Sequence, residues 1–425
     1  EKNGHLPLTM PSVIPESNFH LEAQHVEGFT PEVFWVTEAG SSGKLTEKLA
    51  LRPTSETALY KMYPLWIHSY KDLPFKRYLS CQVWRYETKM TRPFFRGREF
   101  HWIEAHNVYA TMEEAMDQVK EDMEMAYEML QEEFAIPIIF FERPQWDKFP
   151  GAVSTFAADV LMGSGKVMQQ PSTHLLGQNF SKPFNIKFVD KDGEEKYGYQ
   201  TCYGPAISRI YGAVIAYLGD DKGLILPFDI SPIQIVIVPI LYKGREEAVL
   251  KGSKEVYEEL KDKYIVKLDD SDLSVGSKFY YWELKGVPLR IEIGPKDVEN
   301  NKVIVVKRHD GKKLSIQKED LKVKIDDIAQ NYTKEIKEKS LIDFESQIEV
   351  VYEKDAAIEA INNGKIVCCG FCSIGMDAYP CAEVVEKEIG GFVRGRRFDE
   401  EKHEFATCLI CGKPAGCTVY IAKSY

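Results

Sequence analysis

The chain has 425 residues, of which 44% are hydrophobic and 28% charged, and its formal net charge is −11. This composition is typical of a folded protein with roughly two to four domains, and it excludes a disordered chain and a uniformly basic nucleic-acid binder. No stretch approaches the ~18 consecutive apolar residues of a membrane span. The first residues lack a basic segment followed by an apolar one, so we expect no secretory signal and a cytoplasmic protein without membrane contact. Because the chain begins with Glu1 rather than methionine, we expect that its natural N-terminal part is missing.

The first strongly patterned segment is residues 75–109. Here "FKRYLSCQVWRYE" alternates in polarity, "TKMTRP" interrupts the alternation and "REFHWIEAHNVY" resumes it, which predicts a β-hairpin with a long basic loop. Arginines and glutamates are dense around this loop. Exposed ion pairs contribute little to stability, so one interpretation is an ordinary solvated hairpin and the other is a ligand site.

A helix and then an antiparallel sheet are predicted next. Residues 111–134 open with a threonine and an acidic first turn and continue with helical apolar spacing, as an amphipathic helix does. Short strand patterns follow ("IPIIFFER", "KVMQQPSTHLLGQNF", "FNIKFVD"), and "YGPAISRIYGAVIAYLGD" predicts an apolar helix after a Gly-Pro turn. Strands outnumber helices in this region, which favours an antiparallel sheet.

A domain boundary is predicted within "LPFDISPIQIVIVPI", where two prolines precede a fresh buried strand. Strand and helix patterns then alternate in the manner of a small α/β domain, and a charged helix follows near 320–340. Residues 241–340 contain 22 basic and 20 acidic residues, so this segment is the best candidate for contact with a polyanion. We therefore predict domains at 1–232, 233–335 and 336–425.

Seven of the nine cysteines lie in the last 58 residues. Without a secretory signal the compartment is expected to be reducing, which favours a zinc site over disulfides. Cys408 and Cys411 have the two-residue spacing of half a zinc knuckle, and we expect Cys372 and Cys381 to supply the other half of a structural four-thiolate site. The alternative is buried thiols without a metal.

The arginines of the hairpin are suited to a bound nucleotide. Arginine contacts phosphate in a bidentate manner and stacks on bases, and a neighbouring glutamate accepts from an exocyclic amine. The candidates are Arg85, Glu87, Arg96 and Arg98. Arg209 opens the helix in "YGPAISR" and is placed for the other purine face or a terminal phosphate. The chain has neither a P-loop nor a Rossmann motif, so this nucleotide would lie on an antiparallel sheet.

Together these segments resemble the class II aminoacyl-tRNA synthetases. "RYE" with "RPFFRGREFHWIEAH" is similar to motif 2 of that class, "YGPAISR" to motif 3, and "MPSVIPE" to the end of motif 1 with its proline at Pro15. "RPTSET" (52–57), "THLLGQNF" (173–180) and the final "AKSY" resemble elements of the prolyl-tRNA synthetases of archaeal and eukaryotic type, which lack an inserted editing domain. The resemblance extends over residues 9–425.

The resemblance implies an α+β fold: an antiparallel catalytic domain flanked by helices, a mixed α/β anticodon-binding domain and a small α+β zinc-binding C-terminal domain. It implies that L-proline reacts with ATP and Mg²⁺ to give prolyl-adenylate and pyrophosphate, and that proline then passes to the 3′-terminal ribose of tRNA(Pro). The implied assembly is a homodimer. Because a methylene is worth only ~1–3 kcal/mol in a pocket, we also expect activation of alanine or cysteine.

The resemblance also assigns individual residues. The implied proline-binding residues are Thr54, Glu56, Arg85, Trp102, Glu104, Phe149 and His174. Among them Thr54 and Glu56 would accept from the imino nitrogen, while the aromatic side chains would enclose the ring. The implied ATP-binding residues are Arg85, Glu87, Arg96, Gln169, Ser172 and Arg209, with Gln169 and Ser172 contacting ATP or its Mg²⁺ and with Arg85 and Arg209 in catalytic roles.

Alternatives stay open at this stage. Trp102 and Phe149 are of a kind that usually forms core, His174 is equally suited to a structural role, and Thr54 could cap the helix that starts in "SETALYKMYPLW". The first cysteine pair is wider than is usual in the family, which leaves the choice among Cys368, Cys369 and Cys372 open. For the whole chain, the rivals are a synthetase for threonine or histidine and a synthetase-like protein that binds tRNA without aminoacylating it.

Overall fold

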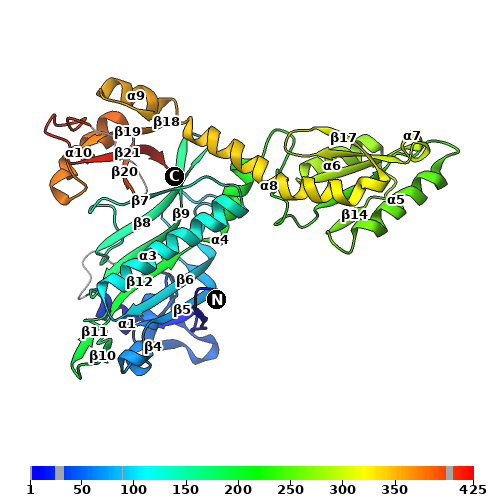
Figure 1. Ribbon diagram of the computed structural model, residues 1–425. Helices are drawn as coiled ribbons and strands as arrows, with labels where there is room; N and C mark the ends of the chain where they lie inside the picture. Colours follow the sequence, from blue (N-terminus) through cyan, green and yellow to red (C-terminus); the bar gives the residue numbers. More distant parts are fainter. Residues whose placement is uncertain (1, 24–32, 89, 399–404) are drawn as a thin grey trace. The chain divides into compact units, whose positions relative to one another are not determined.

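The computed structural model describes residues 2–23, 33–88, 90–398 and 405–425 (Figure 1). The chain divides into two compact units. Unit 1 comprises Glu1–Ala126, Ile138–Gly212 and Gln347–Tyr425, and unit 2 comprises Tyr127–Pro137 and Ala213–Ser346. The last segment of the chain, Gln347–Tyr425, thus belongs to the same compact unit as Glu1–Ala126 and Ile138–Gly212.

Unit 1 is built on a sheet that has eleven strands within the described residues and is mostly antiparallel. The strands, in spatial order, are β1 (Leu6–Pro7), β5 (Phe75–Trp84), β6 (Glu99–Tyr109), β12 (Tyr199–Gly204), β9 (Lys166–Gly177), β8 (Ser154–Met162), β7 (Ile139–Glu142), β20 (Phe392–Arg397), β21 (Cys417–Ser424), β19 (Ile366–Phe371) and β18 (Ile348–Val350). The predicted hairpin is confirmed as β5 and β6, which pair in antiparallel register from Phe75 opposite Val108 to Trp84 opposite Glu99.

Helix α3 (Met112–Tyr127) lies along one face of this sheet (Figure 1) and confirms the predicted amphipathic helix. The Thr111 hydroxyl accepts from the Glu114 backbone N–H at 3.1 Å, and the Glu114 carboxylate accepts from the Thr111 N–H at 3.1 Å, which is a capping box. Asp122 on the buried face accepts from the Thr173 hydroxyl of β9 at 2.7 Å. This bond fixes the helix to the strand that carries the "THLLGQNF" segment. A π-helical turn, Glu128–Glu133, follows α3 in sequence.

The C-terminal segment extends the unit 1 sheet instead of forming a sheet of its own. Strand β20 pairs with β7, with Arg396 opposite Glu142, and β21 runs parallel to the start of β9. Beneath these pairings the buried Asp159 carboxylate accepts hydrogen bonds from the guanidinium groups of Arg143 and Arg394. The two arginines hold the pKa of Asp159 down at about 2 against the effect of burial, so this junction carries a charged carboxylate between two cations.

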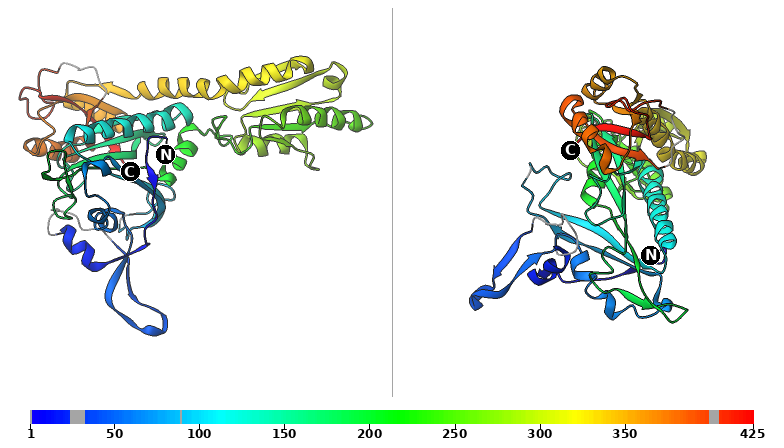
Figure 2. Two further views of the ribbon diagram at one scale, coloured as in Figure 1. Left: turned by 60° about the horizontal axis from the view of Figure 1, so that its bottom comes forward. Right: turned by 90° about the vertical axis from the view of Figure 1, so that its left-hand side faces the viewer.

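Smaller elements complete unit 1. Strands β3 (Trp35–Glu38) and β4 (Lys44–Leu51) form a hairpin that projects from the rest of the unit, with β2 (Val13–Pro15) on the other side of β4 (Figure 2). The remaining pair of strands is β10 (Lys187–Val189) with β11 (Glu195–Tyr197). The helices are α1 (Glu16–Ala23), α2 (Glu56–Leu59), α4 (Ile207–Ala213, whose last residue belongs to unit 2), α9 (Lys354–Asn362) and α10 (Tyr379–Val384).

Unit 2 is an α/β domain, as predicted. Its sheet has the order β14 (Val266–Leu268), β13 (Ile235–Pro239), β15 (Leu289–Ile293), β16 (Lys302–Lys307) and β17 (Lys313–Gln317). The central strands β13 and β15 are parallel and buried at every position, which is why they read as continuous apolar runs. The helices are α5 (Glu246–Leu260), α6 (Val275–Leu284), α7 (Pro295–Glu299) and α8 (Leu321–Glu345). None of the described helices combines the length and hydropathy that crossing a bilayer requires.

Candidate functional site

A cavity of about 550 Å³ opens in unit 1 over strands β6, β8, β9 and β12. Its size is in the range of small-molecule sites. Every residue predicted to bind proline or ATP lines it: Thr54, Glu56, Arg85, Glu87, Arg96, Trp102, Glu104, Phe149, Gln169, Ser172, His174 and Arg209. Arg98 does not line it, and its guanidinium lies over the exposed Tyr86 ring at 5.1 Å.

The floor of the cavity carries two buried carboxylates around one hydroxyl. Thr54 Oγ1 lies 2.6 Å from Glu104 Oε1 and also within hydrogen-bonding distance of Glu56 Oε2. A hydroxyl has one proton, so Thr54 can donate to only one of the two carboxylates. Ser55 donates to Glu104 through its backbone N–H and its hydroxyl. The floor therefore offers more acceptors than the protein supplies donors, which suits a cation with N–H groups.

The interpretation of Thr54 as a helix cap is wrong. The N-cap residue of α2 is Ser55, and no side-chain capping bond is present there. Thr54 precedes this position, and its hydroxyl is directed to the carboxylates of the cavity floor.

Trp102 forms one wall, together with the glycine that it contacts. It is half-buried, and the Arg85 guanidinium lies 4.7 Å from its ring. A Cβ atom at Gly204 would lie 2.6 Å from Trp102 Nε1, closer than such atoms approach. The ring can therefore occupy this position only because β12 has a glycine opposite it.

Phe149 and His174 form another wall, with ring centroids 4.8 Å apart. The His174 nitrogens lie 2.9 Å from the Thr155 hydroxyl and 3.1 Å from the Ser172 hydroxyl. Burial lowers the pKa of His174 to about 4, so its ring is uncharged at neutral pH. Both rings line the cavity. Phe149 also packs against the buried cluster that contains Phe180, and His174 has a hydroxyl partner at each nitrogen, so these residues combine a packing or structural role with a place at the cavity.

Arginines supply positive charge to the cavity. Arg209 donates to the carbonyl oxygens of Phe95 at 3.0 Å and Gln169 at 3.4 Å, and Arg85 Nε donates to the Pro53 carbonyl at 3.1 Å. Burial, reinforced by the nearby Arg85 and Arg96, lowers the pKa of Arg209 to about 10. Such a pKa still leaves it charged at neutral pH, so this part of the cavity is suited to an anion.

Several lining residues were not predicted, and two of them, His106 and Cys202, carry groups that can bind a ligand. His106 stands two positions beyond Glu104 on β6, and the period-2 alternation that places Trp102 and Glu104 on one face includes it as well. Cys202 on β12 is brought in only by strand pairing, opposite His106 on one side and His174 on the other. Burial raises the pKa of the Cys202 thiol well above its ordinary value.

The four predicted C-terminal cysteines come together. The Sγ atoms of Cys372, Cys381, Cys408 and Cys411 all lie within 4.8 Å of one another, and those of Cys372 and Cys381 are 3.8 Å apart. A hydrogen bond from the Lys413 backbone N–H lowers the pKa of Cys411 to about 7. Cys368 and Cys369 are instead buried on β19, so the group that the structure assembles within the described residues contains Cys372.

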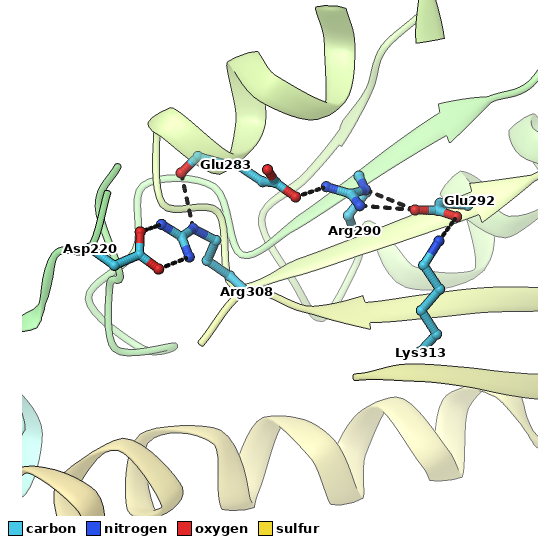
Figure 3. Close-up of polar contacts among 6 residues, drawn as sticks. All are labelled: Asp220, Glu283, Arg290, Glu292, Arg308 and Lys313. Carbon is cyan, nitrogen blue, oxygen red and sulfur yellow. Dashed lines mark hydrogen bonds and ion pairs between the residues drawn. The ribbon is translucent and has the colours of Figure 1, made fainter. Parts of the chain in front are cut away.

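Unit 2 has a smaller polar cavity of about 180 Å³, lined in part by Asp220, Glu283, Arg290 and Arg308. Figure 3 shows how these side chains pair. Arg308 donates to both oxygens of Asp220 and to the Glu283 carbonyl. Arg290 donates to the carboxylates of Glu283 at 3.0 Å and Glu292 at 3.0 and 3.1 Å. Acidic and basic side chains thus alternate in one row from Asp220 to Lys313 (Figure 3).

A mostly antiparallel sheet that carries a nucleotide-sized cavity without a P-loop is the architecture of a class II aminoacyl-tRNA synthetase. Residues 34–217 match the family model of the tRNA synthetase class II core domain (G, H, P, S and T). Residues 234–349 match the anticodon binding domain, and residues 354–425 match the model named prolyl-tRNA synthetase, C-terminal. The resemblance predicted from the motifs is confirmed.

The relatives narrow the class to one family. The proline–tRNA ligase of Thermofilum pendens is 48% identical over 429 residues, which cover 100% of this chain and 88% of that protein. The chain therefore belongs to the proline–tRNA ligase (prolyl-tRNA synthetase) family.

Solved structures agree with the family assignment. Giardia lamblia prolyl-tRNA synthetase in complex with prolyl-adenylate has a TM-score of 0.95 and 37% identity, and the match covers 100% of this chain and 89% of that one. Cryptosporidium parvum prolyl-tRNA synthetase complexed with L-proline and AMP has a TM-score of 0.91 and 31% identity, with 100% and 86% coverage.

Proposed function

We propose that this chain is a proline–tRNA ligase, which activates L-proline with ATP and transfers it to the 3′-terminal ribose of tRNA(Pro). The observation that carries this proposal is the cavity floor in unit 1. Its surplus of acceptors around Thr54 matches the two N–H donors of a secondary ammonium, and uncharged aromatic walls of a size for a small ring stand beside it. The 48% identity to a proline–tRNA ligase supports the same substrate.

In the first step, Thr54, Glu56 and Glu104 hold the proline nitrogen, and Arg85 draws the proline carboxylate toward ATP. A carboxylate oxygen attacks the α-phosphorus, the bond to the β-phosphate breaks, and pyrophosphate leaves. The protein needs no nucleophile of its own, because catalysis rests on alignment and on positive charge placed where negative charge develops.

The remaining assignments concern ATP. We assign the outer phosphates to Arg96 and Arg209 and the adenine to Glu87, while Gln169 and Ser172 contact ATP or its Mg²⁺. Bound Mg²⁺ would neutralise phosphate charge. In the second step a ribose hydroxyl of the tRNA attacks the adenylate carbonyl, so that an ester forms and AMP leaves.

Unit 2 supports recognition of tRNA through its polar cavity. Arginine pairs with the O6 and N7 acceptors of guanine, and a carboxylate accepts from guanine N1–H and the exocyclic amine. Codons for proline begin with two cytidines, so the anticodon presents guanines. RNA loops expose such base edges to protein. We propose that Arg290 and Glu283 read a guanine of the anticodon.

We further propose that Zn²⁺ is held by Cys372, Cys381, Cys408 and Cys411, because four thiolates at this separation form a closed structural site. Metal analysis of the native protein should find at least one zinc per chain, and the Cys381→Ser variant should lose one. A native protein free of zinc would contradict the assignment.

A cytoplasmic homodimer and the division at 1–232, 233–335 and 336–425 stay predictions. The matched family models cover 34–217, 234–349 and 354–425, which supports three regions but with the third beginning after helix α8 (Leu321–Glu345).

The test of the function is ATP–pyrophosphate exchange with each of the twenty amino acids, together with charging of tRNA. We expect strong exchange with proline and measurable exchange with alanine or cysteine, because the chain between the motif 2 hairpin and motif 3 is too short for an inserted editing domain. Preference for threonine or histidine would favour the rival synthetases. Absence of exchange with all amino acids would favour a tRNA-binding protein without activity.

A further inference from the structure

Three buried side chains with metal-binding chemistry meet at the bottom of the unit 1 cavity. They are Glu56 from α2, His106 from β6 and Cys202 from β12, with exposed fractions of 3%, 1% and 5%. One ligand atom of each lies within 4.8 Å of the others. The cluster is separate from the four C-terminal cysteines and has no part in the adenylation step described above, apart from the bond of Glu56 to proline.

His106 has a nitrogen that no group in the described residues satisfies. Its Nε2 is buried without a hydrogen-bond partner, and the nearest carboxylate oxygen, on Glu104, is 3.8 Å away. Its Nδ1 lies 3.2 Å from the Tyr60 hydroxyl. If Nδ1–H donates to Tyr60, Nε2 presents its lone pair to the cluster. Metal-binding histidines are typically oriented in this way by a hydrogen bond at their other nitrogen.

We propose that Glu56, His106 and Cys202 form a binding site for Zn²⁺ that excludes proline from the cavity. One carboxylate, one imidazole and one thiolate are the donor types that zinc prefers, and the open fourth position would face the cavity. Zinc–ligand bonds of about 2.0–2.3 Å require these atoms to approach one another by small side-chain rotations. On binding, zinc replaces the proton of the Cys202 thiol, which passes to solvent, while the other two groups bind through existing lone pairs.

Exclusion follows from the shared use of Glu56, and this step rests on the proposed function. Zinc bound to Glu56 removes an acceptor of the proline nitrogen and places two positive charges where an ammonium must sit. Mg²⁺ does not compete, because it prefers oxygen ligands in octahedral geometry. Zinc therefore acts as a competitive inhibitor toward proline and not toward ATP.

Binding is measured directly with Co²⁺ as a spectroscopic probe on the zinc-containing protein. A thiolate–cobalt charge-transfer band in the near ultraviolet reports coordination by cysteine. We expect a component of this band to be present in the wild type and lost in both Cys202→Ala and Cys202→Ser. The matched control Cys81→Ala removes a cysteine of unit 1 outside the cluster and should keep the component. Thermal melts of all variants show that each is folded.

The same probe tests exclusion. L-proline should abolish the Cys202-dependent component, whereas D-proline, which chelates Co²⁺ in solution equally well, should leave it. An unchanged spectrum in both Cys202 variants would overturn the site. Persistence of the component in saturating L-proline would overturn exclusion.

Kinetics provide an independent check, with each variant compared with itself in the presence of Mg²⁺ but without added zinc. Zinc should raise the KM for proline in pyrophosphate exchange with little change in kcat. Cys202→Ala should require at least about tenfold more zinc for the same effect. Removing a residue that only supports a metal ligand lowers metal affinity about tenfold or more, and removing the ligand itself should lower the affinity at least as much. Equal sensitivity of wild type and variant would refute the proposal. A wild type without any exchange would refute the proposed function instead, while the cobalt spectra would still decide the site.

Discussion

The cavities of the two units differ in whether their charged groups are already paired. In unit 2, Arg290 is held by Glu283 and Glu292, and Arg308 by Asp220 (Figure 3). In unit 1, Glu56 and Glu104 share the single proton of Thr54, although Ser55 also donates to Glu104. Arg85 and Arg209 donate to backbone carbonyls, and the ion pair between Arg96 and Glu87 is long at 3.7 Å. The charged groups of the unit 2 cavity thus largely satisfy one another. The unit 1 cavity is organised for charges that the protein does not supply.

This difference indicates how each cavity uses its ligand. A cation on the unit 1 floor gains hydrogen bonds to charged groups, each worth about 1.5–3 kcal/mol, and no internal pair has to break. A base in unit 2 must exchange existing ion pairs for its own contacts, so the net gain is small. A wrong base would leave the displaced charges unpaired. We therefore expect unit 1 to provide affinity and unit 2 to provide discrimination.

The largest effect is expected for Arg85→Ala. Arg85 is the cation nearest the floor carboxylates and the Trp102 wall, so its loss removes charge stabilisation from the transition state. Losses of single groups of this kind cost about 10²–10³-fold in kcat, and proline-dependent pyrophosphate exchange should fall to background.

Arg98→Ala is the matched control, because it removes an arginine of the same hairpin that lies outside the cavity. It should retain near-normal exchange. Near-normal exchange by folded Arg85→Ala protein would show that Arg85 is not needed for the reaction. The unit 1 cavity would then not be organised for ligand charge as we argue.

Glu56→Gln should act on proline alone. The substitution keeps the shape but removes a charged acceptor from the floor, so the KM for proline should rise about 10- to 100-fold while the KM for ATP changes little. Steady-state exchange with each substrate varied in turn measures this. A parallel rise in both constants would mean that Glu56 supports the cavity as a whole and not the proline nitrogen.

Local patterns predicted most of the fold, and they failed at elements whose sequence lacks the periodicity or the propensity of the structure it forms. Alternation located β5 and β6, and capping signals located α3. Strand β8 was missed, because "STFAADVLM" is buried at nearly every position and has no alternation. Helix α6 was also missed, since "VGSKFYYWEL" is rich in aromatic residues that favour strands. The pairing of β20 with β7 joins segments far apart in the chain, and no local signal specifies such a partner.

The candidate site shows the same limit. The motifs located every residue that was assigned to proline or ATP, and all of them line one cavity. His106 follows from the alternation that places Trp102 and Glu104 together, so the sequence contained its signal. Cys202 is different: only the register of β12 against its neighbours brings its thiol to the cavity floor. A residue that reaches the site only through pairing between distant strands can be located only from the structure.

Arg290→Ala should weaken tRNA charging and leave amino-acid activation intact. If Arg290 reads a guanine, its loss costs about 1–3 kcal/mol, which corresponds to a rise of roughly 5- to 150-fold in the KM for tRNA. Pyrophosphate exchange without tRNA should not change. Lys261→Ala is the control, since it removes a positive charge from an exposed ion pair of the same unit. An equal effect of both variants would indicate general electrostatic attraction instead of base recognition.

The smallest effect is expected from the buried histidines when the pH is lowered. Burial lowers the pKa of His174 from 6.5 to about 4, and its ring nitrogens face only hydroxyls. Between these pH values the unfolded chain binds a proton that the folded chain does not, so the free energy of unfolding falls as the pH drops from about 6.5 to about 4. We expect His174 to account for a loss of roughly 1–3 kcal/mol, measured as the difference between wild type and His174→Gln in denaturant unfolding across this range.

His309 in unit 2 provides the comparison. Burial lowers its pKa too, but its Nε2 lies 2.9 Å from the Glu335 carboxylate, which favours the charged ring. His309→Gln should therefore change the pH dependence of unfolding less than His174→Gln. If His174→Gln and His309→Gln changed the pH dependence of unfolding equally, the histidine beside a carboxylate in unit 2 would resist protonation as strongly as the histidine without one in unit 1. That result would contradict the contrast between the two cavities.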